Sequence, residues 1–230
     1  MGQYFIAVNL DRQEFLYPIR GSGAKLMQHS YIGNEFVETI ARLFSKGNPW
    51  YKSRLVWAGD YMDERIYLDE FESESFMDEK GDYNLYHYST DHFNCLTPFF
   101  EFNSFKFTQS YSYIVNHCKK QYVDINKVPN SEDGLKNHPL PLLTCSGNGR
   151  GMGDYTNAEY EEINNKITIC ENRLNEMNSK IKEEEIIAEL KLLYEQFNQA
   201  TSFVGDWAGN IISVERNIIE GYTEIKPDFK

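Results

Sequence analysis

The sequence predicts an α+β fold: a mixed or antiparallel sheet with one packed helix and an inserted helical hairpin. Three features lead to this prediction: short segments of alternating apolar residues, one amphipathic helical segment, and a long heptad-patterned segment. Of the 230 residues, 15% are aromatic and 25% are charged, which is the composition of a folded protein with a substantial core. We therefore expect residues 1–230 to form a single domain.

The first part of the chain begins with a predicted β-hairpin. Residues 3–10 alternate as in a strand, and residues 14–17 return as a second strand that ends at Pro18. Asn34 is a suitable N-cap for the amphipathic helix that follows it and ends before Gly47. Residues 54–61 then form a predicted buried strand that ends in a Gly-Asp turn.

A second predicted hairpin pairs residues 111–117 with residues 121–125. Near the C-terminal end, residues 204–215 predict a strand and residues 221–225 a short closing strand. The segment from about 62 to 105 is acidic and aromatic and has no regular period, apart from one short strand expected near residues 66–68. We interpret it as an insertion.

Residues 157–200 predict a second insertion, built from helix. Apolar side chains recur at alternating steps of three and four, which is typical of a coiled-coil seam. The seam then shifts register, and this favours a turn within residues 178–184 and two antiparallel helices over one long helix. An oligomer formed through residues 157–200 is a further possibility. The first seam comprises Tyr160, Ile163, Ile167, Cys170, Leu174, Met177 and Ile181, and the second comprises Ile187, Leu190, Tyr194 and Phe197.

Two short motifs occur twice in the same order, which suggests an internal pseudo-repeat. Val8-Asn9 and residues 14–16 match Val115-Asn116 and residues 121–123, and the Trp-Ala-Gly motif at residue 57 matches that at residue 207. If the repeat is real, two similar units share one sheet and bring their glycine loops near a common groove. The alternative is a chance match between common turn-forming sequences.

The chain resembles a family of uncharacterised bacterial and bacteriophage proteins over most of its length, except the two segments interpreted as insertions. The resemblance implies a prokaryotic or phage origin, and it brings no activity, cofactor or site residue with it. It rests on Gly2-Gln3-Tyr4 with Val8-Asn9-Leu10-Asp11, Val56-Trp57-Ala58-Gly59-Asp60-Tyr61, Val115-Asn116-His117, residues 119–124, residues 138–144 with the glycine-rich residues 147–155, and a C-terminal pattern at residues 207–208 and 221–229.

The glycine-rich segment 147–154 is the main candidate for ligand binding. Its successive backbone N–H groups can form an anion-binding nest, and Arg150 can supply a bidentate fork. It lacks the spacing of a Walker or Rossmann motif, so no nucleotide cofactor is predicted. A tight connection that needs glycine for its backbone is the alternative. The candidate ligand-binding residues are Asn148, Gly149, Arg150, Gly151, Asp154, Trp57, Asp60 and Trp207.

Other kinds of site receive less support. His87, Asp91 and His92 do not have a favourable helical ligand spacing, so no metal site is predicted. His117 and Cys118 are adjacent in a predicted strand and point to opposite faces, which makes a nucleophile–base pair unfavourable. No catalytic residue is assigned.

Charge and targeting narrow the function classes. The formal net charge of −12 argues against direct nucleic-acid binding, and the absence of a signal peptide or long apolar run predicts a cytoplasmic protein without a membrane span. We expect a non-enzymatic binding protein of phage or mobile-element type that recognises a nucleotide-like anionic ligand or a host protein, with interference in host defence as one form. The alternatives are a hydrolase of phosphorylated or nucleotide substrates, and an acidic nucleic-acid mimic.

Overall fold

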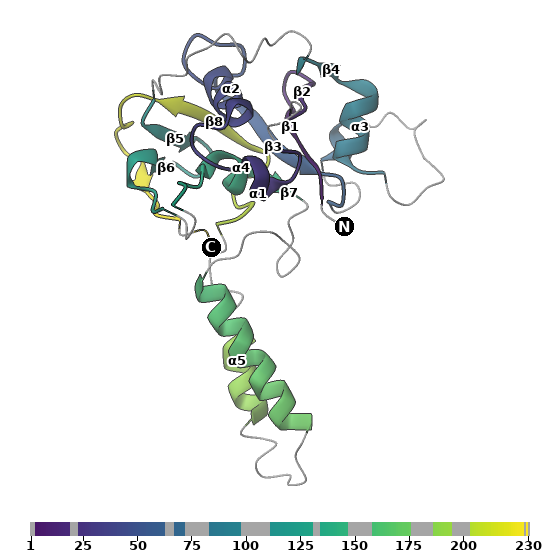
Figure 1. Cartoon of the computed structure of the whole chain (residues 1–230), viewed down its shortest axis with the longest axis vertical. Helices are drawn as coiled ribbons and strands as arrows, with labels where there is room; N and C mark the ends of the chain where they lie inside the picture. Colours follow the sequence, from purple (N-terminus) through teal and green to yellow (C-terminus); the bar gives the residue numbers. More distant parts are fainter. Residues whose placement is uncertain are drawn as a thin grey trace.

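The structure of the chain is a computed structural model that describes residues 3–18, 23–62, 67–71, 83–97, 111–130, 134–146, 158–175, 186–194, 203–227 and 229. Within these residues a nine-stranded mixed sheet carries helices on both faces (Figure 1). The α+β class predicted from the sequence is confirmed.

The sheet has the strand order β4-β2-β1-β3-β8-β5-β6-β9, and β7 pairs with β3. From β2 to β6 in this order the pairings are antiparallel, whereas the outermost pairs β2–β4 and β6–β9 and the additional pair β3–β7 are parallel. The strands are β1 (Phe5–Asn9), β2 (Glu14–Leu16), β3 (Ser53–Gly59), β4 (Asn94–Cys95), β5 (Tyr113–Asn116), β6 (Gln121–Asp124), β7 (Cys145–Ser146), β8 (Asn210–Glu215) and β9 (Thr223–Glu224).

The pairing of the strands has a pseudo-two-fold centre between β3 and β8. Arg54 lies opposite Ile211, and the flanking pairs on either side are equivalent to each other. The hairpin β1–β2 corresponds to β5–β6, and each hairpin carries one parallel edge strand. The sheet is therefore built from two equivalent halves, as the repeated hairpin motif predicts.

The turns of the two hairpins confirm this equivalence. The Asn9 side chain accepts hydrogen bonds from two backbone N–H groups in its turn, and the Asn116 side chain does the same. Each turn ends in a residue with positive φ, Gln13 at 53° and Lys120 at 52°. Asparagine side chains stabilise such turns because they bond to the backbone two and three residues further on.

The repeated tryptophan motif has a different register from the one that the sequence suggests. The indole N–H of Trp50 donates to Glu14 Oε2 over 2.6 Å, and that of Trp207 donates to Gln121 Oε1 over 3.1 Å. Glu14 and Gln121 are the first residues of β2 and β6. Trp207 is thus equivalent to Trp50, and its match with Trp57, which lies inside β3, is wrong.

Backbone contacts support the corrected register. The N–H groups of Trp50 and Trp207 bond to the carbonyl oxygens of Leu43 and Leu143, respectively. Leu43 ends helix α2 (Glu35–Leu43), and Leu143 lies in helix α4 (Pro139–Thr144). The two helices therefore occupy equivalent places in the two halves.

Helices cover both faces of the sheet, so the expectation of one packed helix is wrong. Helix α1 (Leu26–His29), α2 and α4 pack on the face that carries Phe5, Trp57 and Val214 and form the main core with it. Helix α3 (Leu85–His92) and the 3₁₀ helix η1 (Leu68–Glu70) pack on the opposite face of the first half. Another 3₁₀ helix, η4 (Ile125–Lys127), follows β6.

Asparagine caps start two of these helices. Asn34 Oδ1 accepts from the N–H groups of Phe36 and Val37, which confirms the predicted cap of α2. Asn84 caps α3 in the same way, but the segment around it has no apolar period that could have predicted a helix. Helix α4 was also missed, because its two prolines occupy the first turn, where the missing N–H costs no hydrogen bond.

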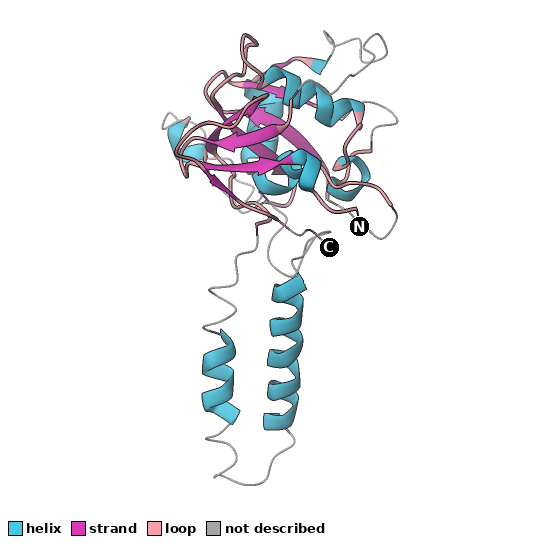
Figure 2. Cartoon of the chain, turned by 90° about the vertical axis from the view of Figure 1, so that its left-hand side faces the viewer, coloured by secondary structure: helices cyan, strands magenta, loops and turns pink. Residues whose placement is uncertain are grey.

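The predicted helical hairpin is confirmed: α5 (Ala158–Asn175) packs against helical residues 186–194 (Figure 2). In the second seam Leu190 packs in the hairpin as predicted, but the residues before and after it are shifted by one position. Ile186 and Leu193 are buried against α5, whereas Ile187 and Tyr194 are 38% and 44% exposed. In the chain the hairpin lies between β7 and Trp207, where the first half has only residues 47–49.

Two strand predictions need correction. Instead of a strand near residues 66–68, Tyr67 has a φ of 70° and η1 begins at Leu68. The predicted strand 204–215 starts only at Asn210, because Gly205 and Gly209 have positive φ and form turns. Among the described residues, no helix has the length and apolar character needed to cross a membrane.

Candidate functional site

Of the predicted ligand-binding residues, Trp57, Asp60 and Trp207 belong to the part of the chain that the structure describes. Asn148, Gly149, Arg150, Gly151 and Asp154 lie outside the described residues, so the anion-binding nest stays a prediction.

The two predicted tryptophans are fully buried and belong to the main core. The Trp57 indole donates to Nε2 of buried His29 over 2.9 Å, so both rings serve the core. Asp60 lies at the end of β3, where its Oδ1 accepts from the Tyr4 N–H over 3.0 Å.

A comparison of the two halves identifies a different candidate. On the sheet face that α3 covers in the first half, the strands carry apolar residues. At the equivalent positions of the second half, most of these residues are replaced by hydrogen-bonding side chains. The equivalent pairs are Ile6 and Tyr113, Leu10 and His117, Phe15 and Tyr122, Val56 and Ser213, and Ala58 and Glu215.

Three of these polar side chains, His117, Ser213 and Glu215, form a hydrogen-bond network together with Tyr222. His117 Nε2 lies 2.8 Å from Ser213 Oγ, and His117 Nδ1 lies 3.0 Å from the Tyr222 hydroxyl. Ser213 Oγ in turn donates to Glu215 Oε1 over 2.7 Å. The network joins the end of β5 to β8 and to the turn before β9.

The acceptor character of the carboxylate fixes the protons of this network. Ser213 has one hydroxyl proton, and the charge-assisted bond to Glu215 takes it. His117 Nε2 must then carry a proton and donate to Ser213 Oγ, which leaves Nδ1 to accept from Tyr222. All hydrogen bonds thus point toward Glu215.

Two residues from the turn before β3 complete the group, which we call the His117 site: Tyr51, Lys52, His117, Ser213, Glu215 and Tyr222. The pKa of Tyr51 is raised mainly by burial and next by its hydrogen bond to Glu215. Burial also lowers the pKa of His117, and the positive charge of Lys52 lowers it further, while Glu215 opposes this. Lys52 is exposed, and its Nζ lies 5.4 Å from the centre of the Tyr51 ring.

The geometry of the His117 site does not suit nucleophilic catalysis. A serine nucleophile must give its proton to the histidine, but Ser213 gives it to Glu215 and is fully buried. Tyr51, His117, Glu215 and Tyr222 are half-buried and present rings and polar groups at the surface. The arrangement suits recognition of a ligand.

A second histidine network lies inside the protein. His138 Nδ1 accepts from the Leu140 N–H, so its Nε2 donates to the Tyr111 hydroxyl over 2.9 Å, and that hydroxyl donates to Glu38 Oε2 over 2.9 Å. Burial lowers the pKa of His138 to about 4. All three side chains are buried, so this network joins α2 to α4 and has a structural role.

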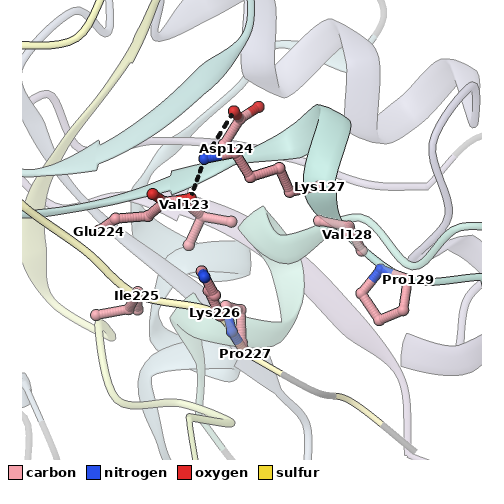
Figure 3. Close-up of a pocket in the computed structure, with 9 residues that line it drawn as sticks. All are labelled: Val123, Asp124, Lys127, Val128, Pro129, Glu224, Ile225, Lys226 and Pro227. Carbon is pink, nitrogen blue, oxygen red and sulfur yellow. Dashed lines mark hydrogen bonds and ion pairs between the residues drawn. The ribbon is translucent and has the colours of Figure 1, made fainter.

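A pocket of about 290 Å³ lies at the outer end of the same half, between β6, η4 and β9 (Figure 3). The Lys127 ammonium bridges Glu224, at 2.7 Å, and Asp124, at 3.6 Å. Apolar residues such as Val123 and Ile225 line the pocket below this ion pair network. Both carboxylates of the pocket already bind Lys127.

The described residues contain no group of three or more His, Cys, Asp or Glu side chains that could hold a metal ion. Their four cysteines are free thiols.

Comparisons with known proteins gave no match: no family model, no curated protein and no solved structure is significantly similar to the chain. The candidate site therefore rests on the geometry alone.

The sequence contained one indication of the His117 site. The repeated Val-Asn motif aligns Leu10 with His117, and a leucine replaced by a histidine at an equivalent position marks a departure from a purely structural role. Ser213 and Glu215 could be added only through the pairing of β5 with β8.

Proposed function

We propose that the chain is a non-enzymatic binding protein that holds a nucleotide-like anionic small ligand at the His117 site. The observation that carries this proposal is the replacement, between equivalent halves, of an apolar surface by a hydrogen-bonded one. A position that only needs to fill a core retains apolar side chains, because a buried polar group costs free energy unless it is bonded. The polar residues of the second half are therefore explained best by a binding role.

The chemistry of the site defines the ligand. The rings of Tyr51 and Tyr222 offer faces on which a planar ring can stack. The Lys52 ammonium can pair with a phosphate or carboxylate of the ligand. A second lysine, Lys120, lies in the turn between β5 and β6, and its carbonyl oxygen accepts a hydrogen bond from the Thr223 N–H. This local positive charge is what an anionic ligand needs on a protein with a net charge of −12.

The hydrogen-bond direction favours binding over turnover. Glu215 holds the Ser213 proton, so the His117 site lacks an activated nucleophile. His117 is neutral near pH 7 because its pKa is lowered, and its ring is fixed by Ser213 on one side and Tyr222 on the other. A fixed ring of this kind gives a ligand a preorganised surface.

Thermal unfolding in the presence of mononucleotides, with and without Mg²⁺, tests the proposal. At a ligand concentration of about 100 times Kd we expect a stabilisation of about 2.7 kcal/mol. Lys52→Gln and Tyr222→Ala should each weaken binding by about tenfold or more. Lys46→Gln is the matched control, because Lys46 is an exposed lysine outside the site and its loss should leave binding unchanged.

Two results contradict the proposal. Conversion of a nucleotide by the purified protein, lost in His117→Gln, would show that the site is catalytic. No stabilisation by any nucleotide, or an equal loss of binding in Lys52→Gln and Lys46→Gln, would show that the His117 site is not where an anion binds.

A further inference from the structure

A second surface with unusual composition lies on the first half, away from the His117 site. Tyr4, Tyr17 and Tyr61 are 50%, 36% and 63% exposed. Tyr86 lies close to Tyr4, Tyr17 and Asp60, and Tyr61 follows Asp60 in the chain; we call these five residues the tyrosine patch. Exposed tyrosines grouped in this way are typical of protein interfaces, because the ring contributes apolar area and the hydroxyl a hydrogen bond.

Four elements bring the tyrosine patch together and hold it in place. Tyr4 precedes β1, Tyr17 follows β2, and Asp60 and Tyr61 follow β3. Two hydrogen bonds of 3.0 Å join Tyr4 and Asp60. The Tyr4 N–H donates to the Asp60 carboxylate, and the Asp60 N–H donates to the Tyr4 carbonyl oxygen. The patch is therefore anchored on strand ends.

Helix α3 adds Tyr86 to this platform through its own cap. The Asn84 side-chain amide donates to the carbonyl oxygens of Asp60, over 3.0 Å, and Met62, over 3.3 Å. Tyr86 is two residues further on, in the first turn of α3. The patch is thus preorganised, which lowers the entropic cost of binding a partner.

Two carboxylates, those of Asp60 and Asp91, lie at the tyrosine patch. Burial, followed by the electrostatic effects of Tyr17, Asp60 and Tyr4, raises the pKa of Tyr86 to about 12. Tyr17 is close to Asp91. Among the described residues, no lysine or arginine contributes to the pKa of either tyrosine, and no ion pair involves Asp60 or Asp91.

We propose that the tyrosine patch docks a basic, arginine-rich segment of a partner protein. Guanidinium groups stack on tyrosine rings and form bidentate bonds with carboxylates, so one segment can use both features of the patch. The two carboxylates and the net charge of −12 attract such a segment and repel an acidic one.

Titration calorimetry of the full chain with a short oligo-arginine peptide tests this proposal. We expect binding at low salt, about tenfold weaker binding in Tyr4→Ala and Tyr61→Ala, and a smaller loss in Asp60→Asn, which keeps the hydrogen bond from Tyr4. Tyr194→Ala, on the helical hairpin, and Glu220→Gln, which removes one negative charge elsewhere, are the matched controls and should bind like the unchanged protein.

Three results overturn the proposal. The first is no binding of the peptide at low salt. The second is an equal loss of affinity in Glu220→Gln and Asp60→Asn, which would reflect net charge alone. The third is unchanged affinity in both Tyr4→Ala and Tyr61→Ala. Circular dichroism of each variant shows whether the fold is kept. Because the His117 site is separate from the tyrosine patch, addition of a mononucleotide should leave the affinity for the peptide unchanged.

Discussion

Arg54 of β3 and Ile211 of β8 face each other at the centre of the sheet, and the other strand pairings are arranged symmetrically about them. The symmetry gives each residue of one half a counterpart whose environment can be compared directly. Such matched pairs separate what the fold requires from what one half does in addition.

Trp50 and Trp207 are the first matched pair. Trp50 bonds to the carboxylate of Glu14 and Trp207 to the neutral amide of Gln121, and bonds to charged groups contribute about 1 kcal/mol more than neutral ones. Trp50→Phe should therefore destabilise the protein by about 1 kcal/mol more than Trp207→Phe, measured by urea unfolding. In a Glu14→Gln background the difference should disappear; if it persists, packing and not the hydrogen bond sets it.

Lys52 and Gly209 occupy equivalent turns with positive φ, 57° and 72°. Lysine is strained in this conformation, so Lys52→Gly should raise the free energy of unfolding by about 0.5 kcal/mol. Gly209→Ala should lower it by more than about 1 kcal/mol, because its Cβ would lie 2.6 Å from Cε1 of Tyr67. Chemical denaturation measures both changes. A change of the same sign in the free energy of unfolding for both substitutions would argue against equivalent turns.

Two buried histidines should make the protein sensitive to acid. Burial lowers the pKa of both His29 and His138 to about 4, below the value of about 6.5 in an unfolded chain. The unfolded state therefore takes up protons first as the pH falls below about 6.5, and the stability present above that pH is lost between about 6.5 and 4, by up to about 3 kcal/mol for each histidine.

Urea unfolding from pH 7 to pH 4.5 measures this loss. His29→Gln should reduce the pH dependence by about half while lowering the stability at pH 7, because it removes one titrating group and the acceptor of the Trp57 indole N–H. A pH dependence identical to that of the unchanged protein would mean that His29 does not titrate in this range.

Tyr111 joins Glu38 to His138 inside the protein. Tyr111→Phe leaves a carboxylate oxygen and an imidazole N–H without this partner and should cost about 2–3 kcal/mol in urea unfolding. Tyr113→Phe is the control: Tyr113 is half-buried, and its hydroxyl has no hydrogen bond among the described residues, so the change should be within about 0.5 kcal/mol. Similar costs for both would show that the network contributes little.

Leu192 and Leu193 test which face of the second helix packs inside the helical hairpin. Leu193 is 7% exposed and packs against α5, whereas Leu192 is 55% exposed. Leu193→Ala should destabilise the hairpin by about 2–3 kcal/mol and Leu192→Ala by about 0.5 kcal/mol or less. Limited proteolysis within the hairpin measures this difference, and faster cleavage of the Leu192 variant would contradict the packing of Leu193 against α5.

Local patterns account for what could be predicted of the fold. Asn34 caps α2 and Asn9 ends β1 through contacts within three residues, so the sequence shows them directly. Helix α3 escaped prediction because its burial comes from packing on β1 and β2, and not from an apolar period of its own. The repeat could be recognised in the sequence, but its register could not. The identical Trp-Ala-Gly motifs suggested that Trp57 is equivalent to Trp207, whereas the hydrogen bonds show that Trp50 is.

The sequence alone determined the α+β class, the two hairpins, the cap of α2 and the helical insertion, because each depends on residues that are neighbours in the chain. Only the tertiary structure decided the register of the repeat, the buried role of Trp57 and Trp207, and the assembly of the His117 site. His117 and Ser213 are 96 residues apart and meet through the pairing of β5 with β8. No local propensity encodes such a contact, since a strand register is set by the packing of the whole sheet.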